Sequence, residues 1–106
     1  MDILANGLLA VIMLGSTHYI DVGKEQPAII FYEDEDTAFM RFPNGKTVTG
    51  EWRFTTDGYF VDWADGPEGE WQIAFEPGRF TYLDDQGRER GDISQIMPGD
   101  PERLKK

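Results

Sequence analysis

The stretch GEWRFTTDGYFVDWADGPEGEWQIAF, from Gly50 to Phe75, decides how this chain folds. It contains all three tryptophans, and the tripeptide Gly-Glu-Trp occurs in it twice, starting at Gly50 and at Gly69. Each copy is followed by alternating apolar and polar residues that end at a glycine-bearing turn. This pattern is typical of half-buried antiparallel strands joined by tight turns. The stretch therefore predicts a β-meander, and it carries no catalytic or ligand-binding signature.

The alternation also predicts which side chains point into the core. We expect the inward residues to be Val48, Gly50, Trp52 and Phe54, then Tyr59, Val61 and Trp63, then Trp71, Ile73 and Phe75. The glycine of each Gly-Glu-Trp copy should let the backbone pass close beside a ring. The turns between these segments, at Pro43-Asn44-Gly45 and at Asp57-Gly58, contain residues that adopt positive φ at little cost.

Further strands extend the meander in both directions. We predict them at Ser16–Ile20, Ala28–Tyr32, Thr37–Phe42, around Phe80 and Tyr82, and at Gly91–Met97. A sheet of about eight strands with one apolar face must curl strongly or close in order to hide its edges. We expect a mainly β fold in one domain over residues 1–106. It should contain an N-terminal helix over residues 1–14, a small antiparallel meander barrel or strongly curled sheet over residues 16–97, and a C-terminal tail over residues 98–106.

The first fourteen residues form a separate apolar segment. Asp2 can cap a helix that runs to about Met13, and Gly15 is placed to end it. Ile3, Leu4, Leu8, Val11 and Ile12 would form its buried face. Because Gly7 weakens a helix, a buried strand over Leu8–Leu14 is the alternative.

This segment resembles the core of a signal peptide only in part. Asp2 stands where a basic residue is expected, and no lysine or arginine precedes Lys24. The apolar run is also shorter than the roughly twenty residues of a membrane span. We therefore expect a cytoplasmic protein; an exported one remains open if the sequence is a trimmed form.

The composition limits the partners. The 106 residues include 20 acidic and 10 basic side chains, a net charge of −10. An acidic surface repels phosphate backbones and anionic lipids, so we expect neither nucleic acid nor membrane as a partner. The absence of cysteine excludes disulfides, thiolate metal sites and cysteine nucleophiles. We expect no cofactor.

Several short motifs, taken in order, resemble small bacterial lipocalin-like (calycin-like) barrel proteins of uncharacterised function. These motifs are Leu14-Gly15-Ser16-Thr17, Phe31-Tyr32, Gly50-Glu51-Trp52-Arg53-Phe54, Asp57-Gly58-Tyr59, Trp63 and Pro98-Gly99-Asp100-Pro101. The resemblance implies a barrel with an interior cavity, and it supplies no catalytic residues. The chain departs from those relatives in lacking their paired cysteines and a secretion signal.

Two groups of residues are of types that could act in catalysis or bind a metal ion. His18 is the only histidine, and with Ser16 on the same strand face it could form a base and nucleophile, although we expect it to be solvent-facing or satisfied in the core. Two aspartate pairs, Asp62 with Asp65 and Asp84 with Asp85, could act as acid and base or bind a hard cation. We expect Asp62 to point outward and the other aspartates to serve turns. We predict no catalytic and no metal residues.

The aromatic residues suggest two kinds of binding. Trp52, Tyr59, Trp63, Trp71 and Tyr82 could line a cavity for a small apolar ligand, although we favour a filled core. Phe39 and Phe60, outward on neighbouring strands, could form an association patch for a homodimer or another protein. We expect a non-enzymatic binding or protein-interaction module. The alternatives are a small-molecule carrier and a lipocalin-fold enzyme that uses a carboxylate acid and base.

Overall fold

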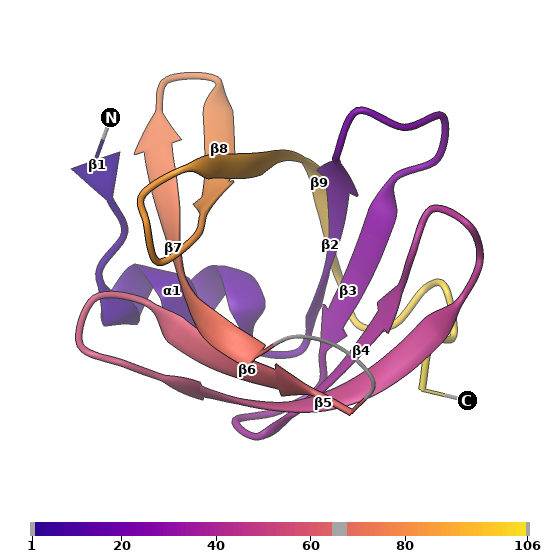
Figure 1. Cartoon of the computed structure of the whole chain (residues 1–106). Helices are drawn as coiled ribbons and strands as arrows, with labels where there is room; N and C mark the ends of the chain where they lie inside the picture. Colours follow the sequence, from indigo (N-terminus) through magenta and orange to yellow (C-terminus); the bar gives the residue numbers. More distant parts are fainter. Residues whose placement is uncertain (1, 65–67, 106) are drawn as a thin grey trace.

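The protein is a closed antiparallel β-barrel with one short helix (Figure 1). The structure, a computed structural model, describes residues 2–64 and 68–105. Its elements are β1 (Asp2–Ile3), α1 (Asn6–Met13), β2 (Ser16–Asp21), β3 (Ala28–Tyr32), β4 (Thr37–Arg41), β5 (Thr47–Phe54), β6 (Tyr59–Trp63), β7 (Glu68–Glu76), β8 (Arg79–Leu83) and β9 (Glu89–Pro98). The eight strands from β2 to β9 each pair with the next, which confirms the predicted meander.

The barrel closes because β9 pairs with both β8 and β2. Its register with β2 runs from Ser16 opposite Pro98 to Asp21 opposite Asp92, with a shift between Tyr19 and Ile20. Such a bulge bends a strand and increases its twist, as closure of a small barrel requires. The eight barrel strands therefore leave no open edge between the first and the last.

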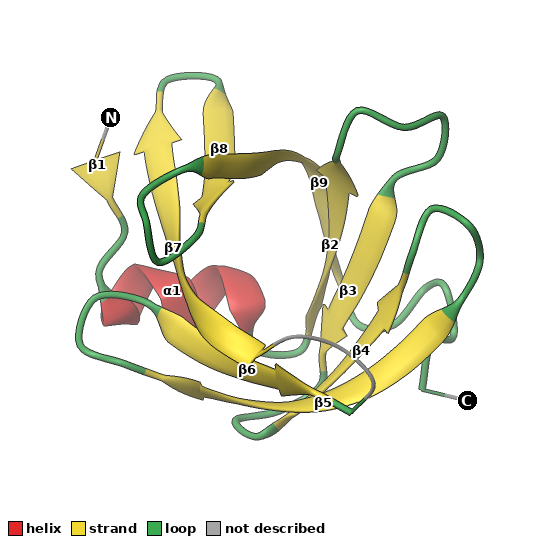
Figure 2. Cartoon of the chain, in the orientation of Figure 1, coloured by secondary structure: helices red, strands yellow, loops and turns green. Residues whose placement is uncertain are grey.

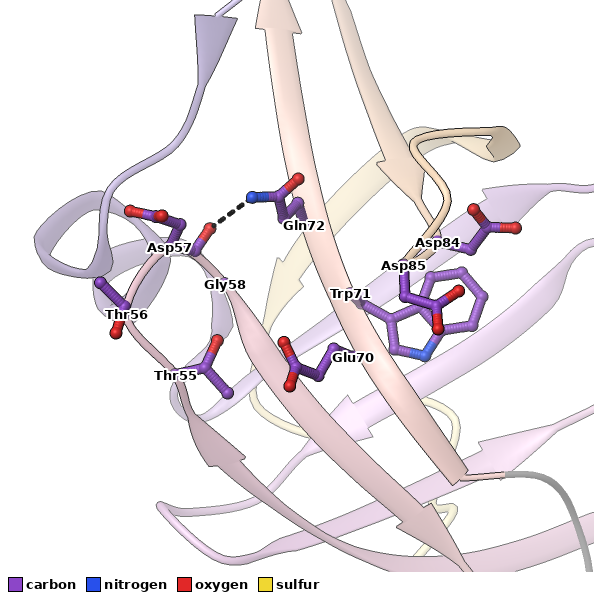
Figure 3. A pocket seen from close by; sticks show the side chains of 9 residues that line it. All are labelled: Thr55, Thr56, Asp57, Gly58, Glu70, Trp71, Gln72, Asp84 and Asp85. Atoms are coloured by element: carbon purple, nitrogen blue, oxygen red, sulfur yellow. Dashed lines mark hydrogen bonds between the residues drawn. The ribbon is translucent and has the colours of Figure 1, made fainter.

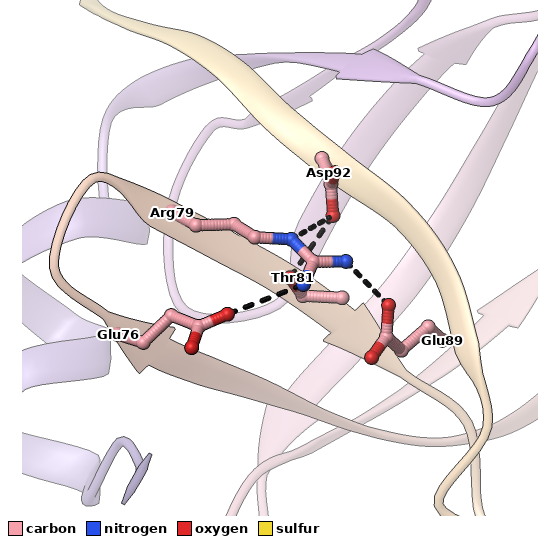
Figure 4. Close-up of polar contacts among 5 residues, drawn as sticks. All are labelled: Glu76, Arg79, Thr81, Glu89 and Asp92. Carbon is pink, nitrogen blue, oxygen red and sulfur yellow. Dashed lines mark hydrogen bonds and ion pairs between the residues drawn. The ribbon is translucent and has the colours of Figure 1, made fainter. Parts of the chain in front are cut away.

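An ion cluster lies on β7, β8 and β9, beside this closure (Figure 4). The guanidinium of Arg79 on β8 pairs with Glu76 on β7 and with Glu89 and Asp92 on β9. Asp92 also accepts a hydrogen bond of 2.9 Å from the Thr81 hydroxyl, which is fully buried. The cluster thus joins three consecutive strands on one face of the sheet.

The predicted inward faces of the central strands are confirmed. Along β5, buried residues alternate with exposed ones, and Trp52 is 2% exposed. Tyr59, Val61 and Trp63 on β6 are all buried. The two faces meet in one core cluster, which fits a sheet with one side packed and the other in solvent.

Phe75 is the exception to the inward prediction, because it is 36% exposed. It lies near the end of β7, opposite Phe80 on β8, where the β7–β8 hairpin extends beyond the ring of strands (Figure 1). Its cross-strand partner Phe80 points to the same side of the sheet, with ring centroids 5.2 Å apart. The exposure therefore occurs at the end of β7 and not through a break in its alternation.

The two repeat glycines play different roles. A Cβ on Gly50 would lie 2.6 Å from Cε3 of Trp63, so the prediction of a close approach to a ring is confirmed there. At Gly69 the nearest atom to such a Cβ is 3.9 Å away, so the same prediction is wrong for the second copy. Gly58 has the closest contact, since its Cβ would lie 2.0 Å from the Trp71 carbonyl oxygen.

The N-terminal segment forms a helix, as predicted, but the predicted start is wrong. The helix begins at Asn6, after Ala5 at the capping position, so Asp2 does not cap it. Instead Asp2 and Ile3 pair with Phe75 and Ala74 of β7 as the short strand β1. β6 covers only the first half of this edge of β7, and β1 hydrogen-bonds the backbone groups that remain.

The buried face of the helix also differs from the prediction. Leu9 and Met13, four residues apart, are fully buried, whereas Leu8 and Val11 are 58% and 75% exposed. Helix α1 lies behind β7 in the view of Figure 2 and turns only a narrow stripe toward the core. Of the described residues, no helix is long and apolar enough to cross a membrane.

Candidate functional site

The barrel holds an apolar cavity of about 290 Å³. The apolar part of its wall includes Ile20, Ala28, Ile30, Met40, Phe42 and Val61. These residues occupy inward positions on β2, β3, β4 and β6 and at the end of β4. Period-two alternation on strands around the ring therefore builds the wall.

Four of the five aromatic residues predicted to line a cavity do lie on it. They are Tyr59, Trp63, Trp71 and Tyr82. Trp52 does not reach the cavity, because its ring packs against Tyr32, Phe54 and Tyr59 with centroids 5.0 to 6.2 Å apart. The interior is thus partly filled by aromatic packing and partly hollow.

The sequence reasoning missed Tyr32 as a lining residue. It belongs to the apolar run Ala28–Tyr32, which was interpreted only as a buried strand. Ala28, Ile30 and Tyr32 all line the cavity, as alternate residues of one strand face should. Their two-residue spacing could have indicated that Tyr32 lines the cavity. Because all five residues of β3 are apolar, the sequence does not show which of its two faces points inward.

The rim of the cavity is formed where connections meet at one end of the barrel. Val22 follows β2, Pro43 follows β4, and Glu68 and Arg90 lie near the starts of β7 and β9. Arg90 donates to the Asp84 carboxylate at 3.1 Å and is about half exposed. The charged groups of the lining therefore stand at the mouth and not in the interior.

The opposite end of the cavity is closed by a buried polar chain. The Tyr32 and Tyr82 hydroxyl oxygens are 2.9 Å apart, and the Tyr82 oxygen lies 2.6 Å from Nδ1 of His18. Nε2 of His18 lies 2.8 Å from the carbonyl oxygen of Ile12 in helix α1. The helix thereby supports the floor of the cavity from behind.

Burial keeps this polar chain uncharged. Desolvation lowers the pKa of His18 to about 4, although the hydrogen bond to the Ile12 carbonyl opposes the shift. Desolvation and the neighbouring phenols raise the pKa values of Tyr32, Tyr59 and Tyr82 well above the usual 10. At neutral pH the floor is thus a set of neutral hydrogen-bonding groups.

The same geometry decides between the interpretations of His18. The side chain is fully buried, so a solvent-facing histidine is excluded and a core-satisfied one is confirmed. Both ring nitrogens are engaged, by Tyr82 and by Ile12. The imidazole therefore has no nitrogen with which to activate Ser16 as a nucleophile.

Of the paired aspartates, Asp84 has a structural role. Asp62 is exposed, as expected, and Asp65 lies outside the described residues. Asp84 is buried and accepts hydrogen bonds from the backbone N–H groups of Gln86 and Arg88. These bonds, with the neighbouring arginines, lower the pKa of Asp84 to about 2. This carboxylate organises the β8–β9 turn.

A second pocket, of about 330 Å³, opens on the outside of the barrel (Figure 3). Its walls carry Asp57, Glu70, Asp84 and Asp85 around the edge of Trp71. Within residues 2–64 and 68–105, no group of three or more acidic or histidine side chains is arranged to hold a metal ion. The inner cavity, with its largely apolar lining, is the better candidate for a binding site.

The two rings proposed as an association patch do not adjoin. Phe39 is on β4 and Phe60 on β6, and β5 lies between them, so the expectation of neighbouring strands is wrong. Phe39 stacks on Phe31 at 6.2 Å, and Phe60 lies 4.5 Å beneath the guanidinium of Arg53. Each ring is covered locally on its own part of the surface.

Comparison of the chain with protein-family models, with curated proteins and with solved structures finds no match.

Proposed function

We propose that this protein binds one small, mostly apolar molecule inside its barrel. The observation that carries the proposal is the 290 Å³ cavity, which has an apolar wall, a polar floor and a charged rim. Ligand pockets are typically concave and apolar, with a few polar groups that fix orientation. At roughly 30 Å³ for each water molecule in the liquid, the cavity has the volume of about ten waters, which is enough for a ligand of about ten non-hydrogen atoms.

The geometry favours ligand binding over the other expected functions. Phe39 and Phe60 form no joint surface for association. For an enzyme, the interior would need a titrating acid or base, whereas His18 is neutral and doubly hydrogen-bonded. An eight-stranded meander barrel with an interior ligand also agrees with the lipocalin-like resemblance, which we retain as part of this proposal.

The proposal is tested with 1-fluoronaphthalene, whose eleven non-hydrogen atoms match the cavity. Its ¹⁹F resonance should broaden in the presence of the protein, because the bound ligand tumbles with the barrel. In Ala28→Phe a ring enters the cavity from β3, and the broadening should disappear.

Thr49→Phe is the matched control, since Thr49 is exposed on β5 and outside the cavity. This variant should broaden the resonance as the unmodified protein does. Urea unfolding shows whether each variant is folded. Equal broadening by folded Ala28→Phe and Thr49→Phe, or none by the unmodified protein, would refute the proposal.

A further inference from the structure

The hydrogen-bonded chain at the floor of the cavity has a defined direction. The Ile12 carbonyl can only accept, so Nε2 of His18 carries the ring proton and donates it at 2.8 Å. Nδ1 of the neutral ring is then an acceptor, and it takes the hydroxyl proton of Tyr82. One peptide carbonyl in helix α1 thus sets the orientation of the chain.

The direction extends to the cavity surface. Because the Tyr82 proton points to His18, the 2.9 Å contact requires Tyr32 to donate to the Tyr82 oxygen. The Tyr32 hydroxyl proton is then donated to Tyr82, and the Tyr32 oxygen keeps lone pairs that can accept a hydrogen bond. Tyr32 lines the cavity and therefore offers an acceptor to any ligand.

Tyr59 supplies the complementary group. Its ring packs edge-on against Tyr32 at 6.0 Å and against Tyr82 at 6.4 Å, and it also lines the cavity. The Tyr59 hydroxyl already interacts with the Tyr32 and Tyr82 hydroxyls. Because a phenol proton rotates between partners, it can turn from the Tyr32 oxygen to the oxygen of a ligand placed between them. A ligand group that both donates and accepts satisfies Tyr32 and Tyr59 together.

We propose that the ligand is a compact neutral molecule with a single hydroxyl group, an alcohol or a phenol, bound hydroxyl-inward against Tyr32 and Tyr59. The inference rests on the proposed function and specifies its ligand class. A carbonyl group would leave the Tyr32 acceptor unused. A carboxylate at the floor would meet neutral phenols, since Arg90 at the rim already pairs with Asp84.

The test compares three molecules of one shape, toluene, p-cresol and p-toluate, as competitors of 1-fluoronaphthalene in the ¹⁹F experiment. We expect p-cresol to displace the probe at a concentration about five- to tenfold lower than toluene, the effect of one net hydrogen bond. p-Toluate should be the weakest competitor. A stronger p-toluate than p-cresol would overturn the proposal and indicate a ligand anchored by charge at the rim.

Substitutions that remove one hydroxyl group at a time show which tyrosines cause the preference for p-cresol. Tyr32→Phe and Tyr59→Phe should each reduce the preference for p-cresol over toluene while toluene still competes. Tyr19→Phe is the matched control, because the Tyr19 hydroxyl lies outside the barrel and donates to Glu102 at 2.8 Å. If Tyr32→Phe does not fold, Tyr59→Phe carries the comparison, and an unchanged preference there overturns the proposal.

The two proposals fail in different ways. Equal competition by toluene and p-cresol in the unmodified protein overturns the hydroxyl preference and leaves apolar binding in place. Failure of 1-fluoronaphthalene itself to bind overturns the proposed function, and the hydroxyl preference with it.

Discussion

Lowering the pH from 7.5 to 5.0 should destabilise the barrel through one residue, His18. The imidazole is fully buried and lies among Tyr82, Tyr32 and the Ile12 carbonyl. Protonation would place a charge in this site and turn the Nδ1 acceptor into a donor facing the Tyr82 proton. Folding therefore favours the neutral ring, and acid favours the unfolded chain.

The size of the effect follows from the two pKa values of His18. The value is about 4 in the folded protein and 6.5 in the unfolded chain. Between them the unfolded chain binds more protons, so the stabilisation is complete above pH 6.5 and is lost as the pH falls through about 4. Linkage gives a loss of about 2 kcal/mol in the free energy of unfolding at pH 5.0 relative to pH 7.5.

Urea unfolding followed by tryptophan fluorescence measures this loss at pH 7.5, 6.5 and 5.0. His18→Gln is the control, because its amide cannot titrate and can still donate toward the Ile12 carbonyl. This variant should be less stable at pH 7.5 but should lack the 2 kcal/mol acid-dependent loss. Since His18 is the only histidine, its ring protons also report the pKa directly by NMR. A midpoint near 6.5 in the folded protein, or equal pH slopes for both proteins, would refute the reasoning.

Three further substitutions, two of them with a control variant, test the core, the contact between Gly58 and β7, and the β8–β9 turn. Trp52→Ala should cost about 3 to 5 kcal/mol, because the ring is 2% exposed and packed against three others; an unchanged urea midpoint contradicts this. Gly58→Ala should cost about 1 to 3 kcal/mol or more, since its Cβ would overlap the backbone of β7, whereas Gly69→Ala should cost little; equal losses in thermal unfolding contradict the contact. Asp84→Asn should lower the thermal midpoint at pH 7 and Asp85→Asn should not, and the difference should shrink as the pH falls from 3.8 through about 2.

Residue alternation predicted the barrel wall well because strand periodicity is local. A side chain on β5 or β6 points inward whenever its neighbours two residues away do, so Trp52, Tyr59 and Trp63 could be placed from the sequence. The position at which the barrel ends depends on strands that are distant in sequence, so the residues around one position do not indicate it. Phe75 obeys the alternation of β7 but is 36% exposed at the end of that strand.

The start of the helix and the polar floor depend on distant partners. Asp2 pairs with Phe75 because β6 leaves part of one edge of β7 free. His18 and Tyr82 are 64 residues apart in sequence, and nothing in either neighbourhood indicates the other. The sequence could therefore suggest a cavity lined by aromatic residues, while the direction of its hydrogen bonds required the fold.

The pairing of β9 with β2 has a consequence for the newly made chain. Strand β2 cannot pair with β9 until about eighty more residues have been synthesised. The hydrogen bond from the Thr17 hydroxyl to the Gly99 carbonyl spans this separation. Until then the growing sheet has two open edges, which are sites of intermolecular pairing. Forming such distant contacts is also slow, because the intervening loop must first be closed. A chain that ends before Glu89 should therefore aggregate in the cell, even though nearly all of its core residues are already present.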